Sequence, residues 1–300
     1  MLKMKLDIIG FGALNLDRLY RVERIAREGE HSPIKEFYEF PGGSAANTIA
    51  GLAKLGVKAG FIGAVGDDKE GKFLLNEFKK FGVDIGGIDI LNGHTGIIIG
   101  FVDDKGERTL YPYPGVNDLV EFRKEYSRYL ENTKYLHLSS FVNDKQFDVQ
   151  KRLVESLPKN IIISFCPSDL YARRGMDELL PIIERGSIIF LNETEIREIT
   201  GEGYRGGSTI LIENGADTVV VTLGKGGCYI KNSDSEYRIN AFHTRVVDTT
   251  GAGDAFNAGF LYGIINGKSL EESGRIGNWI ASKCIEKFGA RAGLPRKIEI

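Results

Sequence analysis

Short β-branched apolar runs alternate with stretches of helical periodicity along this chain, and that alternation restricts its fold more than any other feature. Near-continuous apolar runs of this length are typical of strands buried on both faces of a parallel sheet. The helical stretches would cover those faces, so the sequence predicts an α/β fold with a mostly parallel central sheet and helices on both sides. The runs are Leu6–Phe11, Ala59–Val65, Gly96–Val102, Tyr135–Leu138, Ile161–Phe165, Ser187–Leu191 and Thr218–Leu223.

Several helical stretches carry signals that mark their ends. Ser44–Leu55 and Glu70–Phe81 are each followed by a glycine, the residue that most easily takes the left-handed conformation found after a helix. Ser269 and Glu272 have capping-box spacing at the start of the last helix, which we expect to end at Gly289. The apolar stripe of this helix contains Ile276, Trp279, Ile280, Cys284, Ile285 and Phe288.

Two segments, Arg18–Phe40 and Gly93–Tyr113, instead alternate polar and apolar residues one by one. The sequence Asp104-Lys-Gly supplies a hairpin turn in the second of them. We predict that residues 12–40 and 93–113 form a small antiparallel sheet that can cover a cleft as a lid. Its exposed strands could pair with a second copy of the chain, so a homodimer through the lid is predicted.

Composition and charge exclude several classes of protein. The 300 residues, 42% hydrophobic and 27% charged, fit a single folded domain over 1–300. Lys+Arg number 39 and Asp+Glu 41, so we expect no nucleic-acid partner. No apolar run is long enough to span a bilayer and the start lacks a signal peptide, which predicts a cytoplasmic protein without a membrane partner. Cys166, Cys228 and Cys284 are far apart, which argues against a disulfide framework and a zinc site.

The stretch from Asp248 to Phe256 carries the strongest chemical signal. A strand-like segment, Thr244–Val247, leads into it, and a helix is predicted from about Ala252 to Ile265. Gly251 and Gly253 leave backbone N–H groups uncovered at the helix start, where the macrodipole favours an anion such as a phosphoryl group.

Asp254 lies in the first turn of that helix, where we expect it to be ionised. It could accept a proton from an attacking hydroxyl while the amides bind the phosphoryl group. A purely structural role also fits, in which Thr250 or Asp254 caps a helix that packs closely through its glycines.

Further polar residues occur near the ends of strands and the starts of helices. Asp17 follows the first strand and would face the crevice at the carboxyl edge of the sheet, where it could hold two vicinal hydroxyls. Gly42 and Gly43 let a ligand approach the backbone, and Asn47 could hydrogen-bond a hydroxyl. The structural alternatives are a solvated turn for Asp17 and tight helix–sheet packing, with Ser44 as the cap, for the other group.

Two later strand ends fit a nucleotide and its metal ion. Asn192 and Glu195 could hold a hydrated Mg²⁺, although Asn192 is also a good helix N-cap. After Thr222, the glycines between Gly224 and Gly227 would let ribose and phosphates lie against the backbone, with Lys225 offsetting their charge; a plain hairpin turn is the alternative. No GxxxxGK[ST] motif occurs, which excludes a P-loop NTPase.

Together these segments resemble the ribokinase or PfkB family of sugar and nucleoside kinases, from Leu6 to about Pro295. The resemblance rests on Gly42–Asn47, continuing to Gly66-Asp67, and on Asp248–Phe256. It implies a ribokinase-like fold with a β lid. It also implies an enzyme that transfers phosphate from ATP, with Mg²⁺, to a hydroxymethyl group of a sugar, a sugar derivative or a nucleoside.

The resemblance further implies a role for each matching residue. Asp254 would be the general base, and the amides of Gly251, Ala252 and Gly253 would form the anion hole. Substrate hydroxyls would contact Asp17, Gly42, Gly43 and Asn47, while Asn192 and Glu195 would associate with Mg²⁺. The nucleotide would lie on Thr222, Gly224 and Gly227 with Asn278 near adenine, and a monovalent cation such as K⁺ on Asp248, Thr250 and the backbone around 288–293.

One position departs from the family pattern. Many relatives have Asp-Pro-Asn after the strand that corresponds to Ile161–Phe165, and this chain has Cys166-Pro167-Ser168. That Asp usually lies near the metal and the phosphates, so its replacement alters the expected metal shell. We expect Cys166 to be a buried structural thiol.

The acceptor stays open at the level of sequence. Arg108 on the lid, and Arg173 and Arg174 after the Cys166 loop, could bind a phosphate or carboxylate of a sugar phosphate or sugar acid, or could be solvated surface. A neutral sugar fits as well. A nucleobase could stack on aromatic residues that could equally pack among themselves, namely Phe11, Phe37, Phe40, Tyr111 and Tyr113.

Two other classes of protein are alternatives. An NAD-dependent oxidoreductase is suggested by Gly10 and Gly12, which half-match the dinucleotide fingerprint, but Asn15 replaces the third glycine and no helix follows. A non-catalytic sugar- or nucleotide-binding protein would keep the pocket and lack the base, and the presence of Asp254 argues against it.

Overall fold

A large, mostly parallel sheet forms the centre of the protein. The computed structural model describes residues 6–105, 108–131 and 133–300. In the described chain nine strands pair in the order β13-β12-β11-β10-β9-β8-β1-β4-β5, parallel from β11 to β5 and antiparallel at β12 and β13. They are β1 (Ile8–Phe11), β4 (Ala59–Gly66), β5 (Asp84–Leu91), β8 (Tyr135–Ser139), β9 (Ile162–Cys166), β10 (Ile188–Asn192), β11 (Thr218–Thr222), β12 (Cys228–Asn232) and β13 (Glu236–Ile239).

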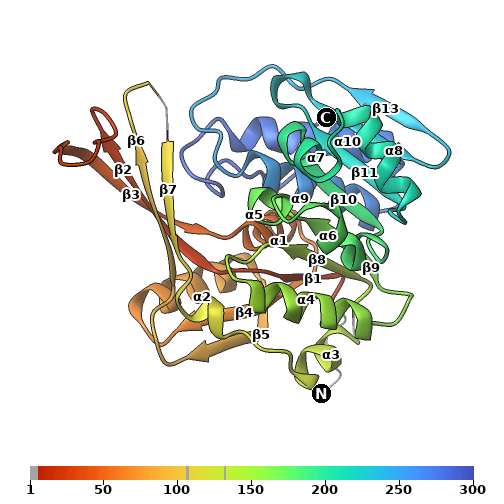
Figure 1. Ribbon diagram of the computed structural model, residues 1–300, viewed down its shortest axis with the longest axis horizontal. Helices are drawn as coiled ribbons and strands as arrows, with labels where there is room; N and C mark the ends of the chain where they lie inside the picture. Colours follow the sequence, from red (N-terminus) through yellow and green to blue (C-terminus); the bar gives the residue numbers. More distant parts are fainter. Residues whose placement is uncertain (1–5, 106–107, 132) are drawn as a thin grey trace.

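Helices cover both faces of this sheet, as the sequence predicts (Figure 1). Successive strand residues point to opposite faces, so Ile8 packs with one helical layer while Ile9 and Phe11 pack with the other. One layer contains α1 (Ser44–Lys54), α2 (Lys69–Phe81), α9 (Ala252–Ile265) and α10 (Leu270–Cys284). The other contains α3 (Lys124–Leu130), α4 (Asp144–Ser156), α5 (Ser168–Ala172), α6 (Gly175–Ile183), α7 (Glu193–Thr200) and α8 (Tyr204–Glu213).

A second, small sheet stands out from one side of the large one (Figure 1). Its strands pair in the order β3-β2-β6-β7, and they are β2 (Asn15–Val22), β3 (Ile34–Gly42), β6 (Gly96–Val102) and β7 (Arg108–Tyr113). The prediction of a wholly antiparallel sheet is wrong, because β2 and β6 pair in parallel. The chain enters β6 from β5 and not through a hairpin, which removes the constraint that makes neighbours antiparallel.

The predicted ends of the helices are largely confirmed. Gly82 ends α2 in the left-handed conformation, and Ser269 and Glu272 form the capping box of α10. α9 has the predicted bounds. α10 ends at Cys284, before Gly289, and the half-exposed Phe288 ring stacks on Tyr38 of the small sheet instead.

Three other local expectations have different outcomes. Thr244–Val247 is not a strand, because the Val247 N–H donates to the carbonyl of Ile285 beyond α10, 2.8 Å away, and not to a neighbouring strand. Gly96–Val102 belongs to the small sheet and not to the core. Gly106 of the expected hairpin turn lies outside the described residues. Of the helices that the structure describes, none combines the length and apolar character needed to cross a bilayer.

Candidate active site

The carboxyl ends of the central strands meet the start of α9 at one cavity. Its volume is about 170 Å³. In an open α/β sheet this edge is where ligands bind. Residues that line the cavity come from five separate parts of the chain and include Ser44, Cys166, Asn192, Glu195, Gly253 and Asp254.

Asp254 in the first turn of α9 is held by two neutral donors from α1. Ser44 Oγ donates to Oδ1 across 2.7 Å, and Asn47 Nδ2 donates to Oδ2 across 2.9 Å. Burial raises the pKa of Asp254 to about 6, while the two hydrogen bonds and the charge of Arg291 act in the opposite direction. The carboxylate is therefore ionised at neutral pH and remains a usable base.

Arg291 is the main residue that the sequence analysis missed. It follows α10 within the short run Ala290–Gly293, and its side chain is buried next to the α1 start. Arg291 Nε donates to Asn47 Oδ1 across 2.8 Å, and Nη2 donates to the Gly42 carbonyl across 3.1 Å. Burial lowers its pKa to about 10. The sequence signal that could have identified Arg291 is an arginine between small residues, but no neighbouring residue indicates which groups it would bind.

Asp17 lies in β2, and the backbone of Gly42 packs directly against its carboxylate. A Cβ at Gly42 would lie 2.2 Å from Asp17 Oδ1, so only glycine allows this approach. Burial raises the pKa of Asp17 to about 7, a shift that Arg291 opposes and Asp254 reinforces. Gly43, at φ 94°, caps α1 against the carbonyl of Ala13. The structure thus brings the predicted substrate contacts Asp17, Gly42, Gly43 and Asn47 together beside Asp254.

The glycines at the start of α9 serve different purposes. Gly251 has φ 75°, and a Cβ there would lie 2.3 Å from the Cβ of Ala290, so it packs tightly. A Cβ at Gly253 would meet nothing within 4 Å, so that residue faces the open cavity. The Ala252 N–H donates to the carbonyl of Thr249 across 3.2 Å, so a turn already uses one of the three predicted anion-hole amides.

Asn192 and Glu195 form the capping box of α7, which confirms the structural reading of Asn192. Glu195 accepts hydrogen bonds from the Asn192 backbone at 3.0 Å and from its amide at 2.7 Å. Burial raises the pKa of Glu195 to about 7. Cys166 is only partly buried and lines the same cavity, and burial raises the pKa of its thiol to about 12.

Two carboxylates, Glu195 and Asp254, line this cavity. The described ranges of the chain contain no group of three or more His, Cys, Asp or Glu residues that could hold a metal ion alone. Mg²⁺ usually keeps several waters and binds one or two carboxylates together with substrate phosphates. The residues present therefore fit a Mg²⁺ ion that arrives with a nucleotide.

The turn after β11 lies beside the cavity. Thr222 lines the cavity, and the turn continues through η2 (Gly224–Gly226), where Lys225 is exposed. Gly227, at φ 88°, packs against the Ile239 carbonyl, which a Cβ would approach to 2.0 Å. Asn278 of α10 donates to the carbonyls of Ile239 and Asn240 across 3.2 Å each, so it fixes the segment behind the turn.

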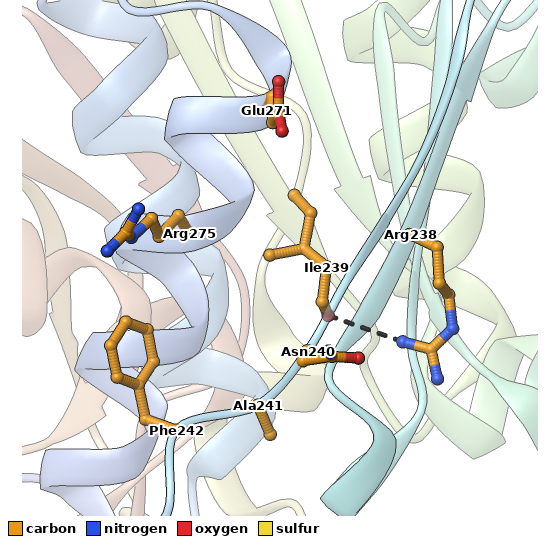
Figure 2. A pocket seen from close by; sticks show the side chains of 7 residues that line it. All are labelled: Arg238, Ile239, Asn240, Ala241, Phe242, Glu271 and Arg275. Atoms are coloured by element: carbon orange, nitrogen blue, oxygen red, sulfur yellow. Dashed lines mark hydrogen bonds between the residues drawn. The ribbon is translucent and has the colours of Figure 1, made fainter.

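The second cavity has a volume of about 330 Å³ and lies between that segment and α10 (Figure 2). Arg238 of this cavity hydrogen-bonds the carbonyl of Gly226 in the turn. The cavity is lined by Arg238, Ile239, Asn240, Ala241, Phe242, Glu271 and Arg275.

The residues predicted to bind a monovalent cation hydrogen-bond one another and the segment after α10. Asp248 Oδ1 accepts from the N–H and the hydroxyl of Thr250, at 2.9 and 2.7 Å. Its Oδ2 accepts from the Gly289 N–H at 2.9 Å. Asp248 thus joins the start of α9 to the segment after α10, where Arg291 lies.

Several candidates lie away from these cavities. Arg108 of β7 lies opposite Val102 of β6 in the strand register. This is one end of the small sheet, and Gly96 and Gly42 lie at the other end. Arg173 pairs with Asp169, and Arg174 pairs with Asp144 and Glu178. Phe11 is fully buried in the core, and Phe40 contacts Gly289; Phe37, Tyr111 and Tyr113 are exposed.

Known proteins resemble this chain over nearly its whole length. The sequence model of the pfkB family carbohydrate kinases matches residues 5–297. An uncharacterized sugar kinase of Archaeoglobus fulgidus is 42% identical over 252 residues, 83% of this chain and 100% of that protein. An ATP-dependent ribose-1-phosphate kinase of Halopiger xanaduensis is 29% identical over 288 residues, 95% of this chain and 94% of that protein. The structure of Arabidopsis thaliana ribokinase complexed with ribose and ATP has a TM-score of 0.85 and 25% identity, covering 97% of this chain and 96% of that chain.

The fold and these matches define a sugar or nucleoside kinase, a phosphotransferase that acts on an alcohol group. The chain belongs to the PfkB family of carbohydrate kinases. The predicted family and the ribokinase-like α/β fold with a second, small sheet are confirmed.

Proposed function

We propose that this protein transfers the γ-phosphoryl group of ATP to a hydroxymethyl group of a sugar or sugar derivative, with Asp254 as the general base. The observation that carries the proposal is the buried carboxylate of Asp254, held by Ser44 and Asn47 beside an open helix start. A base with a pKa of about 6 is ionised at neutral pH and can still take a hydroxyl proton.

The start of α9 would stabilise the transferring phosphoryl group. Gly253 lines the cavity, and the helix macrodipole favours negative charge there. The amide of Gly251 would contribute, and that of Ala252 would do so once it leaves the carbonyl of Thr249. Such positioned donors act where charge develops during phosphoryl transfer.

Glu195 and Asn192 would hold Mg²⁺ through water and the nucleotide phosphates, and the ion would neutralise phosphate charge during transfer. Asp248 and Thr250 would hold a monovalent cation such as K⁺ with the backbone after α10. Because Asp248 bonds both Thr250 and Gly289, occupancy of that loop would steady the start of α9.

The nucleotide would span the two cavities. Its base fits the second cavity, where Ile239, Ala241 and Phe242 offer apolar surface and Arg275 a planar cation (Figure 2). Its ribose and phosphates would follow the turn from Gly227 and Gly224 to Thr222, with Lys225 beside them. The contact of Arg238 with the turn, together with its place in the lining of the second cavity, supports this path.

The acceptor would lie between Asp17, Gly42, Gly43 and Asn47, with the small sheet closing over it as a lid. Closure would exclude water and so prevent hydrolysis of ATP. Arg108 is too far along the small sheet to contact an acceptor beside Asp254, six strand residues from Gly96, so we assign it no role in binding.

The decisive experiment is a transfer assay with ATP and, separately, ADP as donor. Acceptors would be D-ribose, ribose 1-phosphate, fructose 6-phosphate and adenosine, with ³¹P NMR as the readout. We expect a new phosphomonoester on one of them that requires Mg²⁺. If all four acceptors remain unmodified while nucleotide binds, the proposed transfer to these acceptors is contradicted.

We also propose that two copies associate through the small sheet. Ile34, Phe37 and Tyr111 are more than half exposed on it, an unusual amount of apolar surface for one small sheet. Sedimentation analysis should give a dimer, and Phe37→Arg should give a monomer. A monomeric wild type would contradict this association.

A further inference from the structure

Arg291 and Asp17 leave two polar atoms without partners at the acceptor end of the site. Arg291 is only 6% exposed, and it uses Nε and Nη2, yet its Nη1 is covered and has no hydrogen-bond partner. Asp17 Oδ1 is likewise covered and unpartnered. Covered donors and acceptors normally have partners, so a matched pair of this kind indicates a missing ligand group.

The two side chains carry opposite charges that interact electrostatically. Burial lowers the pKa of Arg291, and Asp17 is the foremost of the carboxylates that oppose this shift. Both residues are described, and they do not form an ion pair within 4.0 Å. Gly42 lies against both, since its carbonyl accepts from Arg291 Nη2 and its Cα approaches the Asp17 carboxylate. A carboxylate and a guanidinium therefore flank the same bare stretch of backbone at Gly42.

We propose that one hydroxyl of a polyol acceptor bridges these atoms, donating its hydrogen to Asp17 Oδ1 and accepting from Arg291 Nη1. Arg291 is then a specificity-determining residue of this kinase; the proposal rests on the proposed function. A hydroxyl is at once a donor and an acceptor, which is what this pair requires. A phosphate has only acceptors when fully ionised and would be repelled by the carboxylate, so an acceptor's phosphate would lie elsewhere.

The same arginine also orients the acceptor relative to the base. Its Nε donates to Asn47 Oδ1 across 2.8 Å, and this fixes the Asn47 amide so that Nδ2 faces Asp254 Oδ2, 2.9 Å away. The Asn47 side chain therefore connects Arg291 to Asp254, so a hydroxyl bound by Arg291 has a fixed position relative to the base. Reversal of the Asn47 amide would place an oxygen against the carboxylate, which costs free energy.

The test is calorimetric binding of D-ribose without nucleotide, using wild type, Arg291→Gln and Arg291→Lys. Loss of a hydrogen bond to a charged group should weaken D-ribose binding by about tenfold or more in Arg291→Gln. Arg291→Lys should bind D-ribose with intermediate affinity, because the lysine ammonium keeps the positive charge but lacks the planar set of N–H donors of the guanidinium. Arg123→Gln is the matched control, since Arg123 pairs with Asp89 on the surface and should leave affinity unchanged.

Deoxy sugars identify the bridging hydroxyl. With 2-deoxy-D-ribose and 3-deoxy-D-ribose as probes, the analogue that lacks this hydroxyl should bind wild type and Arg291→Gln equally weakly. The losses from the two changes are then not additive, as for groups in direct contact. Equal D-ribose affinity of wild type and Arg291→Gln, or additive losses for both analogues, would overturn the proposal.

The binding measurements test the subsite, and the transfer assay tests the proposed function, so the two proposals can fail independently. A wild type that binds D-ribose but phosphorylates no acceptor contradicts the proposed function, while the affinities still decide the subsite. If D-ribose does not bind, the tightest-binding acceptor of the panel replaces it, and binding of none overturns the subsite. Should Arg291→Gln be unfolded by circular dichroism, an unchanged affinity in Arg291→Lys would be the contradicting result.

Discussion

Ser44 Oγ donates a hydrogen bond to Asp254 Oδ1 across 2.7 Å and so ties the start of α1 to the start of α9, although the residues are 210 positions apart. Burial raises the pKa of Asp254, and this bond and the one from Asn47 limit the rise. Each carboxylate oxygen keeps a further lone pair. The arrangement therefore holds the base in place and leaves it able to accept a substrate proton.

Replacement of Asp254 by Asn should abolish turnover without unfolding the protein. The amide keeps the size of the side chain but cannot take a proton, so kcat should fall by about 100-fold or more. ATP affinity, measured by calorimetry, should persist because the nucleotide contacts lie elsewhere. A variant with near-normal kcat would refute the assignment of the base.

Replacement of Ser44 by Ala should move the acidic limb of the kcat/KM profile to higher pH. Removal of a hydrogen bond to the ionised form raises the pKa of Asp254 further above about 6, so activity is lost earlier as pH falls. The ionisation of Asp17, with a pKa of about 7, contributes to the same limb, and the Ser44→Ala substitution should leave that pKa unchanged.

Thr48→Val provides the control for this shift. Thr48 also lies on α1, but its hydroxyl donates to the backbone carbonyl of Asp254 across 3.3 Å and not to the carboxylate. Its acidic limb should coincide with that of wild type. Equal shifts in both variants would show that α1 packing, and not the hydrogen bond, sets the pKa.

The sequence reveals much of this site because its signals are local. The bounds of α9 and the position of Asp254 follow from glycines and a carboxylate within a few residues of one another. Arg291 is different, since its partners Asn47 and Gly42 lie 244 and 249 positions away, and only the folded chain joins them. The small sheet was misjudged for a similar reason. Alternation identifies a strand, but the direction of β6 against β2 depends on the elements between them.

Replacement of Asp17 by Asn should stabilise the unliganded protein at neutral and alkaline pH. Burial raises the pKa of Asp17 from 3.8 to about 7 in the folded state. Ionisation therefore costs wild type stability as pH rises from about 4 to about 7, and above that the cost is constant. The melting temperature of Asp17→Asn should exceed that of wild type by an amount that grows through this window, while its acceptor KM rises.

Asp148→Asn is the matched control for the stability effect. The Asp148 side chain is 63% exposed and pairs with Lys151 on α4. Its melting temperature relative to wild type should change little across the same pH range, because an exposed ion pair contributes little. A flat difference for Asp17→Asn would mean that burial does not raise the pKa of Asp17 in the folded protein.

The two glycines at the start of α9 should respond in opposite ways to the same substitution. Gly253→Ala should fold normally, because its Cβ meets nothing within 4 Å, but the methyl enters the cavity and displaces the phosphoryl group. A displacement of this size should reduce kcat/KM by about 100-fold. Gly251→Ala forces a side chain to φ 75° and to within 2.3 Å of Ala290 Cβ, so it should lower the free energy of unfolding by on the order of 1–3 kcal/mol. Chemical denaturation and steady-state kinetics on both variants check this. Loss of stability in Gly253→Ala, or full activity in it, would show that this helix start does not face a reacting group.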